Sequence, residues 1–430
     1  MVDVVQELST PVDWQSDSMQ RRRKARYAAD RRLQIYGLVA IIFALGFLFF
    51  LIATLTIAGY KAFIQTTATV RLDLSAVEID RSDLMKANWR RIVRGALREQ
   101  IPGEMSRKEE RAYYSIFTSS AAYIVRNKIM DNPTLLDGPA VFDIPLSDPF
   151  DQLAKNEIDR DLPENRRRVS DLQIKFYDQL VQAGIVSQPI NWGLFLNNDS
   201  RFPELAGLKG ALSGSFWALL VCFLISFPLG IAAAIYLEEF APKNRITDLI
   251  EININNLAAV PSVVFGLLGL AVFLGWFGLP RSAPLVGGMV LSLMTLPTII
   301  IVARAALKSV PSAIREAALG IGASKHEAIF HHNLPLAMPT IMTGTIIGLA
   351  QALGETAPLL LIGMNAFITS DPGGVMEAST ALPTQIYIWA DSPERGFVAR
   401  TSAAILVLLG FLIFMNAAAI LLRQRFERRW

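Results

Sequence analysis

The chain has 430 residues, of which 52% are hydrophobic and only 18% are charged. Soluble globular proteins carry about 25% charged residues, so this composition excludes an ordinary soluble enzyme. The net charge of +3 creates no strong field that would attract nucleic acid, and the single cysteine, Cys222, excludes both an internal disulfide framework and a multi-cysteine zinc site.

The chain begins with a basic segment, residues 1–33, followed by a long apolar run. A secretory signal peptide also begins with basic residues, but its apolar core has about 7–15 residues. The apolar body here runs for 24 residues, from Ile35 to Ala58. We therefore predict an uncleaved first transmembrane helix at 34–60, which keeps the protein in the lipid bilayer.

Six stretches in all lack Asp, Glu, Lys and Arg, and the shortest has 22 residues. At a rise of about 1.5 Å per residue, a helix of that length extends about 33 Å and crosses a hydrocarbon core of ~30 Å. We predict an all-α polytopic membrane protein with six transmembrane helices. The stretches are residues 35–60, 210–237, 252–280, 282–303, 328–354 and 401–422.

Residues 61–205, between the first and second stretches, carry 20 of the 41 basic and 21 of the 38 acidic residues. Helices are predicted at 84–100 and 108–127, and a segment of this size can bury a core of its own. We therefore predict a mainly α-helical folded domain. Its sequence contains no catalytic triad, phosphate loop or metal cluster, and leaves open whether it is a docking surface or a structural spacer.

Lys and Arg residues near the predicted spans are distributed asymmetrically. With the long 61–205 segment left out, 17 lie on the side of the N-terminus and four on the opposite side. Because cytoplasmic segments are enriched in Lys and Arg, we predict that both termini are cytoplasmic and that the 61–205 domain is extracytoplasmic.

Proline and glycine are frequent within the predicted spans. Pro228, Pro261 and Pro297 fall in the second, third and fourth of them. Such residues suit helices that bend or pack closely. Ordinary helix packing explains each of these prolines and glycines by itself. A prediction that the spans move to form a transport pathway therefore needs a second signal in the sequence.

The second signal is the segment 310–335 between the fourth and fifth spans. Good helix formers are followed by Gly320 and Gly322, which supply a helix stop and a sharp turn. A Ser-x-x-Glu capping box at 324–327 then starts a new helix, and Pro335 ends the segment. The pattern predicts two short helices joined by a glycine turn and attached to the membrane at both ends.

Residues 316–335, EAALGIGASKHEAIFHHNLP, resemble the EAA loop of bacterial ABC importer permeases, in which EAA, a glycine, an isoleucine and Leu-Pro recur at fixed spacing. The positions in register are Glu316, Ala317, Ala318, Gly322, Leu334 and Pro335. His332 replaces the isoleucine. In that family the loop is a coupling helix that sits in a groove of a separate cytoplasmic ATPase.

The EAA loop implies that this chain is a transporter subunit rather than an enzyme. No Walker A pattern occurs in the chain, so ATP and Mg²⁺ are expected in the partner ATPase. We predict that the chain itself has no cofactor. His326, His331 and His332 all fall in the loop, but their spacing gives no i, i+4 pair, so we predict no metal site either.

Four further stretches are similar to the PstA-type permeases of the bacterial phosphate-specific importer. They are AVPSVVFGLLGL (259–270), MTLPT (294–298), ALGETAPLLLIG (352–363) and ALPTQIYIWA (381–390). The resemblance covers roughly residues 205–430 and the first span. It implies a permease core at 206–430 with five transmembrane helices, and an inner-membrane importer of inorganic phosphate.

The same resemblance implies a PstC-type permease, a PstB-type ATPase dimer and a periplasmic phosphate-binding protein as partners. Whether the second permease is a copy of this chain or a different one stays open. An importer of another oxyanion, such as phosphonate, sulfate or molybdate, is an alternative. A membrane sensor is disfavoured because the C-terminal tail has only about eight residues.

Glu355 lies within an otherwise apolar stretch. Ionisable residues in membranes usually face a cavity or a partner of opposite charge. Arg304 and Arg281, at the ends of the fourth and third spans, are candidate partners, and a guanidinium suits phosphate because it binds two oxygens at once. We therefore select Arg281, Arg304 and Glu355 as candidates for the substrate pathway, with a purely structural buried pair as the alternative.

Overall fold

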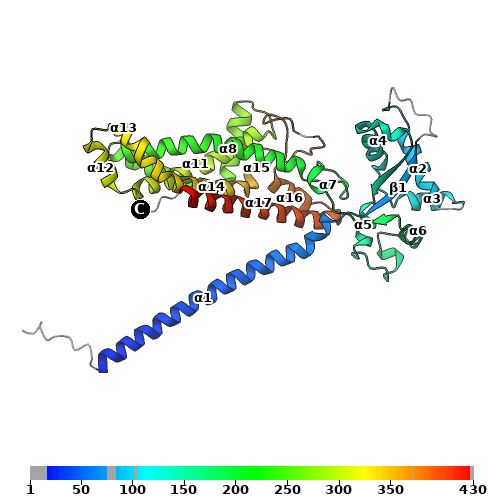
Figure 1. The fold of residues 1–430 in the computed structure, drawn as a ribbon, viewed down its shortest axis with the longest axis horizontal. Coiled ribbons are helices and arrows are strands. Elements are labelled where there is room, and N and C mark those ends of the chain that lie inside the picture. The colour runs from blue at the N-terminus through cyan, green and yellow to red at the C-terminus, as the bar shows by residue number, and fades with distance from the viewer. Residues whose placement is uncertain (1–16, 75–83, 101–103, 371, 427–430) are drawn as a thin grey trace, which may run out of the picture. The chain divides into compact units, whose positions relative to one another are not determined.

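The first helix of the protein is longer than the predicted first span. The computed structural model describes residues 17–74, 84–100, 104–370 and 372–426 (Figure 1), and residues 1–57 and 58–430 form two separate units. In the first unit, α1, Asp17–Gly59, includes both the basic segment from residue 17 onwards and the apolar run. The rest of the predicted N-terminal segment, residues 1–16, lies outside the described residues, as do the last four residues.

A small antiparallel sheet organises residues 61–205. Its central strand, β1 (Thr67–Asp73), lies between β2 (Pro139–Pro145) and β3 (Val186–Ser187). Side chains along β1 alternate between the core and the surface, and Val70 and Leu72 are among the buried ones. This alternation is the period of a strand with one buried face. The domain is mainly helical, as predicted, but the sequence reasoning did not identify the sheet.

Five helices pack around that sheet and enclose a core with Tyr113, Phe142 and Phe150 among its largest side chains. They are α2 (Trp89–Glu99), α3 (Arg107–Tyr114), α4 (Ala121–Asp131), α5 (Asp148–Ala154) and α6 (Asp171–Gln182). The predicted helix at 108–127 is wrong, because α3 ends at Tyr114 and α4 begins at Ala121. Between them, Thr118 donates its backbone N–H to the Pro145 carbonyl, 3.0 Å away, so tertiary pairing interrupts the helix.

Four long apolar helices form a bundle in the C-terminal half (Figure 1). They are α8 (Lys209–Ile235), α11 (Pro284–Ser309), α14 (Leu334–Leu353) and α17 (Gly396–Phe426), and neighbouring helices pack in the order α8, α11, α14, α17. Small residues permit close packing. A Cβ built on Gly288 of α11 would lie 2.6 Å from the Ala218 carbonyl oxygen of α8.

The third predicted span, 252–280, is not one straight helix. The structure has α9 (Arg245–Ala258) followed by α10 (Ser262–Leu268) and a π-helical continuation, η6 (Gly269–Trp276), with a bend of 101°. Pro261 at the break lacks an N–H and disfavours helical geometry in the residue before it. Among the described residues, five helices can cross a membrane, or six if the bent pair counts as one span.

The fifth predicted span ends in a second interruption. Helix α14 stops at Leu353, a non-helical turn contains Glu355, and the short helix α15 (Ala357–Leu361) follows. A further short helix, α16 (Leu382–Ala390), precedes α17. The C-terminal core is therefore an α-helical bundle with interrupted segments.

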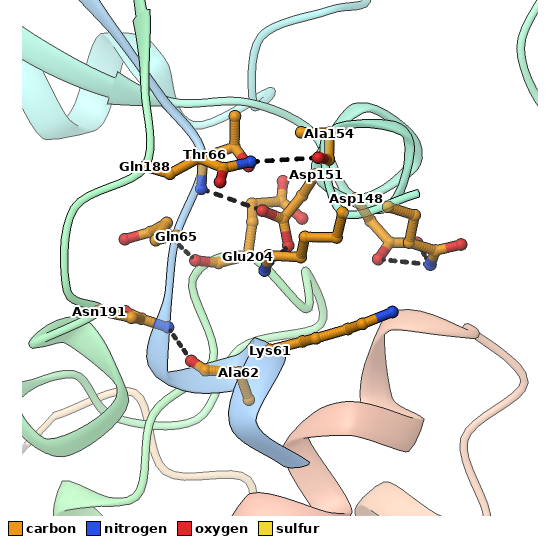
Figure 2. A network of polar contacts seen from close by, with 12 residues as sticks. Lys61, Ala62, Gln65, Thr66, Asp148, Asp151, Ala154, Gln188, Asn191 and Glu204 are labelled. Atoms are coloured by element: carbon orange, nitrogen blue, oxygen red, sulfur yellow. Dashed lines mark hydrogen bonds and ion pairs between the residues drawn. The ribbon is translucent and has the colours of Figure 1, made fainter. Parts of the chain in front are cut away.

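A network of polar contacts within residues 61–205 lies beside the end of the bundle where α8 and α17 begin, here called the domain end (Figure 2). Thr66 donates its backbone N–H to Asp151, 3.0 Å away, and Asn191 donates its side-chain N–H to the Ala62 carbonyl, 2.9 Å away. On the bundle side, the buried Arg400 of α17 donates to the Ala206 carbonyl. Asp199 joins the domain to the bundle, because it accepts the Trp389 indole N–H of α16 over 3.1 Å and donates its own backbone N–H to the Ile368 carbonyl over 2.9 Å.

Candidate functional site

The segment 310–335, here called the coupling loop, forms a helix, a turn and a second helix as predicted. Helix α12 (Ser312–Gly320) ends in a turn in which Gly322 has φ +95°, a left-handed conformation that favours glycine. The Gly322 and Ala323 N–H groups donate to carbonyls of α12 over 3.0 and 3.1 Å. These contacts close the end of the helix.

The second helix begins with the predicted capping box. The Ser324 backbone N–H donates to the Glu327 carboxylate over 2.8 Å, and the Glu327 N–H donates back to the Ser324 hydroxyl over 3.2 Å. The expectation that Pro335 ends this segment is wrong. Helix α13 (Lys325–Glu327) continues through a π-helical turn, η7 (Ala328–Asn333), directly into α14.

Pro335 fits this continuous helix because it lies in the first turn of α14, directly after the π-helical segment, where a missing N–H is tolerated. The coupling loop therefore connects rigidly to α14. A displacement of the loop would act on that span without an intervening flexible linker.

The six residues of the matched motif have different exposures. Glu316, Ala317, Gly322 and Pro335 are exposed, Leu334 is half-buried and Ala318 is buried. Apolar side chains lie on the same surface, since Ile321 is 86% exposed and Leu319 and Phe330 are also exposed. An exposed acidic residue beside an apolar patch can dock another protein.

A buried carboxylate, which the sequence reasoning missed, connects the coupling loop to α8. Glu239 lies in η5 (Tyr236–Phe240), the π-helical turn that ends α8, and its side chain is only 4% exposed. Arg315 of α12 contacts one carboxylate oxygen at 2.9 Å, and the Asn333 amide donates to the other over 3.2 Å. The only sequence signal is the adjacent acidic pair, Glu238 and Glu239, after a long apolar run.

Arg304 has partners other than Glu355. Its guanidinium lies 2.5 Å from the Glu251 carboxylate and 3.6 Å from that of Glu238. Lys308, one turn further along α11, lies 3.4 Å from Glu238. These ion pairs connect α8, α9 and α11 at the loop end of the bundle.

Glu355 and Arg281 lie apart from that cluster. Glu355 is half-buried in the turn between α14 and α15, and its side chain has no ion pair or hydrogen bond within the described residues. Arg281 is exposed in the turn before α11 and approaches Gly363 at the far end of α15. The structure thus brings the motif residues together in one loop, but it pairs Glu355 with neither arginine.

The three histidines form no cluster with other ligands. His326 stacks on Phe330 with ring centroids 4.4 Å apart. Within the described ranges, no three His, Cys, Asp or Glu residues are close enough to hold a metal ion. Among the described residues, this end of the molecule has exposed loop side chains and the ion pairs given above.

Two family models match the chain. A domain of unknown function, DUF3333, matches residues 20–164, and the binding-protein-dependent transport system inner membrane component matches residues 226–430. A solved structure of the MetNI methionine ABC transporter is also similar, with 18% identity and a TM-score of 0.38 over 52% of this chain and 95% of that one. The family assignment does not depend on that structure.

Curated relatives share about 30% of their residues with this chain. A probable ABC transporter permease protein, YqgI of Bacillus subtilis, is 30% identical over 54% of this chain and 83% of its own length. The phosphate transport system permease protein PstA 1 of Mycobacterium tuberculosis is 32% identical over 52% and 72%. PstA of Yersinia pestis is 30% identical over 50% and 71%. With the coupling loop and the helical bundle, these matches show that the chain belongs to the PstA-type permeases of the binding-protein-dependent ABC importer family.

Proposed function

We propose that this permease carries inorganic phosphate across the bacterial inner membrane and is driven by a separate ATPase. The observation that carries the proposal is the similarity to several permeases named as phosphate transport proteins, which extends over most of their length. The exposed coupling loop supports the ATP-driven part. Phosphate is proposed over other oxyanions because of those relatives.

The partners follow from this proposal. A PstC-type permease would complete the pathway, a PstB-type ATPase dimer would bind ATP and Mg²⁺, and a periplasmic phosphate-binding protein would deliver the anion. Because ATP is cytoplasmic, the coupling loop and both termini would face the cytoplasm. The domain at 61–205 would then face the periplasm, in agreement with the distribution of Lys and Arg.

Glu355 and Arg281 are proposed residues of the pathway, at opposite ends of the short helix α15. A half-buried carboxylate without a partner among the residues that the structure describes suits a water-filled passage or a cation on the partner permease. Arg304 is a weaker candidate because two carboxylates already neutralise it.

Uptake of labelled anions tests this function. A strain that lacks this chain is compared with the same strain carrying the gene, with phosphate, sulfate, molybdate and a phosphonate as separate substrates. We expect restored uptake of phosphate alone. Restored uptake of sulfate, molybdate or phosphonate without phosphate would overturn the substrate and leave the importer mechanism in place.

A further inference from the structure

Glu239 occupies an unusual position for a carboxylate. It lies at the end of a predominantly apolar helix and is almost completely buried. A charge in such a place costs free energy unless it is paired and hydrogen-bonded. Both oxygens of Glu239 have partners, and both partners belong to the coupling loop rather than to α8 itself.

The two partners come from opposite ends of the coupling loop. Arg315 directly precedes Glu316, the first residue of the matched motif, and Asn333 is the last residue of η7, where the loop passes into α14. One carboxylate of α8 therefore holds both ends of the loop. Because Arg315 makes a charged hydrogen bond, its contact is the stronger of the two.

Helix α8 can carry a displacement from this point into the membrane. It packs along α11 over much of its length, and Gly230 and Gly288 bring the two backbones close. A loop pushed by an outside protein would move Arg315, and the buried ion pair would pull α8 in the same direction. The loop also meets α8 through apolar packing, since Ile329 shares a buried cluster with Ile231 and Ile235, but the Glu239–Arg315 contact adds an ion pair between them.

We propose that the Glu239–Arg315 pair is a mechanical link through which the coupling loop moves α8, so that Glu239 is a positioning residue for transport. The inference rests on the proposed ATP-driven function and extends it to a specific contact. It distinguishes Glu239 from its neighbour Glu238, whose ion pairs are with residues of α11 and do not involve the loop.

The test uses the complete transporter in proteoliposomes with ATP and inorganic phosphate. The variants are Glu239→Gln, Arg315→Gln and the double variant, and Lys308→Gln is the matched control because it breaks an ion pair at the same end of the bundle without touching the loop. Glu239→Gln keeps the shape of the side chain. Arg315 is partly exposed, so Glu239→Gln leaves an arginine that water can solvate, whereas Arg315→Gln leaves the buried Glu239 carboxylate with only the Asn333 hydrogen bond.

We expect each single variant to assemble with the ATPase and hydrolyse ATP, while phosphate imported per ATP falls by at least about fivefold, the lower limit for typical coupling between sites. The double variant should import no less phosphate per ATP than the more impaired single variant, because both single changes remove the same contact. Lys308→Gln should keep the wild-type ratio. A wild-type ratio in both single variants would overturn the proposal and reduce the pair to a structural contact.

A second measurement follows α8 without relying on phosphate. A fluorophore at Leu229→Cys, an exposed position on α8, is introduced with Cys222→Ala so that it is the only thiol. ATP should change its signal in the wild-type background, and Glu239→Gln should abolish that change. An undiminished change in the variant would refute the link. If ATP produces this pattern but no phosphate is imported, the substrate assignment fails and the link stands.

Discussion

The two ends of the helical bundle both use charged residues to hold a segment outside the membrane, but they do so differently. At the loop end, Glu239 of a span reaches out to a short loop whose other face is exposed. At the domain end, Arg400 of a span is buried beside carboxylates of a large domain with its own core. Under the proposed function, the loop end would receive and transmit movement, and the domain end would stay fixed.

The largest expected effect comes from the turn of the coupling loop. Proline fixes φ near −65°, whereas Gly322 has φ +95°, so Gly322→Pro should abolish phosphate uptake while the protein remains in the membrane. Gly322→Asn is the matched control because asparagine tolerates the left-handed region, and it should retain most uptake. Normal uptake by the proline variant at wild-type protein levels would contradict the coupling role of this loop.

A change at the motif glutamate should have a similar result without altering the backbone. Glu316 is exposed on α12, so Glu316→Lys should leave the fold intact and reverse the charge that the partner meets. We expect uptake to be lost with normal insertion, measured as labelled phosphate accumulated per amount of membrane protein. Wild-type uptake in this variant would show that the exposed face of α12 does not dock the ATPase.

The domain end should respond through stability. Arg400 interacts electrostatically with Asp148, Asp151 and Glu204, so Arg400→Met would remove a buried cation near all three, although Asp148 keeps Arg168 and Asp151 keeps Lys155. The variant also loses the charged hydrogen bond from Arg400 to the Ala206 carbonyl, and a hydrogen bond to a charged group contributes about 1.5–3 kcal/mol. Thermal unfolding in detergent should show a clear decrease in Tm.

The matched control for Arg400→Met is Arg160→Met, because Arg160 pairs with Asp178 on the exposed surface of the domain. Exposed pairs contribute about 0–1 kcal/mol, so this variant should unfold close to the wild-type temperature. Equal stability of the two variants would remove the distinction between a fixed domain end and an ordinary surface.

Between the two ends, Glu355 should affect transport but not assembly. Glu355→Gln removes a half-buried charge that has no partner in this chain's described residues, so uptake should fall several-fold while the ATPase still co-purifies. Quantitative pull-down of the complex, together with labelled-phosphate uptake, measures both. Loss of co-purification would place Glu355 in assembly rather than in the pathway.

The smallest expected effect is a pH dependence at the domain end. Burial raises the pKa of Glu204 and of Asp148 above the ordinary carboxyl value, so the folded state holds their protons more tightly than the unfolded state. This contribution to stability is present at low pH and is lost as the pH rises through the raised pKa values. This contribution to stability therefore begins to decrease above about pH 4, the ordinary carboxyl pKa.

The measurement for this pH effect is the free energy of unfolding of wild type relative to Glu204→Gln. The difference should fall as the pH rises above about 4, because only wild type loses the bound proton. A difference that stays constant or grows with pH would show that Arg400 and the hydrogen bonds to Glu204 outweigh burial at this site.

Local patterns predicted much of the molecule. The capping box at Ser324 and the turn at Gly322 depend on neighbouring residues only, and both occur as predicted. The bend at Pro261 shows where this reasoning reaches its limit. The proline marks an interruption, but the packing of α9 and α10 sets the angle of 101°. The absence of charges over residues 252–280 therefore predicts a single span and not this bend.

Long-range contacts account for what the sequence did not predict. Glu239 and Arg315 are 76 residues apart, and nothing in either local segment indicates that they meet. Thr118 ends a helical pattern only because it pairs with a strand edge at Pro145. Arg304 and Arg281 are the candidate partners of Glu355 from sequence, but Arg304 pairs with Glu238 and Glu251 once α8, α9 and α11 pack together.

The most direct test of the account is contact between the coupling loop and an ATPase in native membranes. Ile321 is the most exposed apolar residue of the loop, and a photo-crosslinking amino acid placed there reports what covers it. The same probe at the exposed Tyr123 of the domain is the control. We predict an ATPase adduct from position 321 and none from position 123. Illumination that yields no ATPase adduct from position 321, with or without nucleotide, would contradict the account.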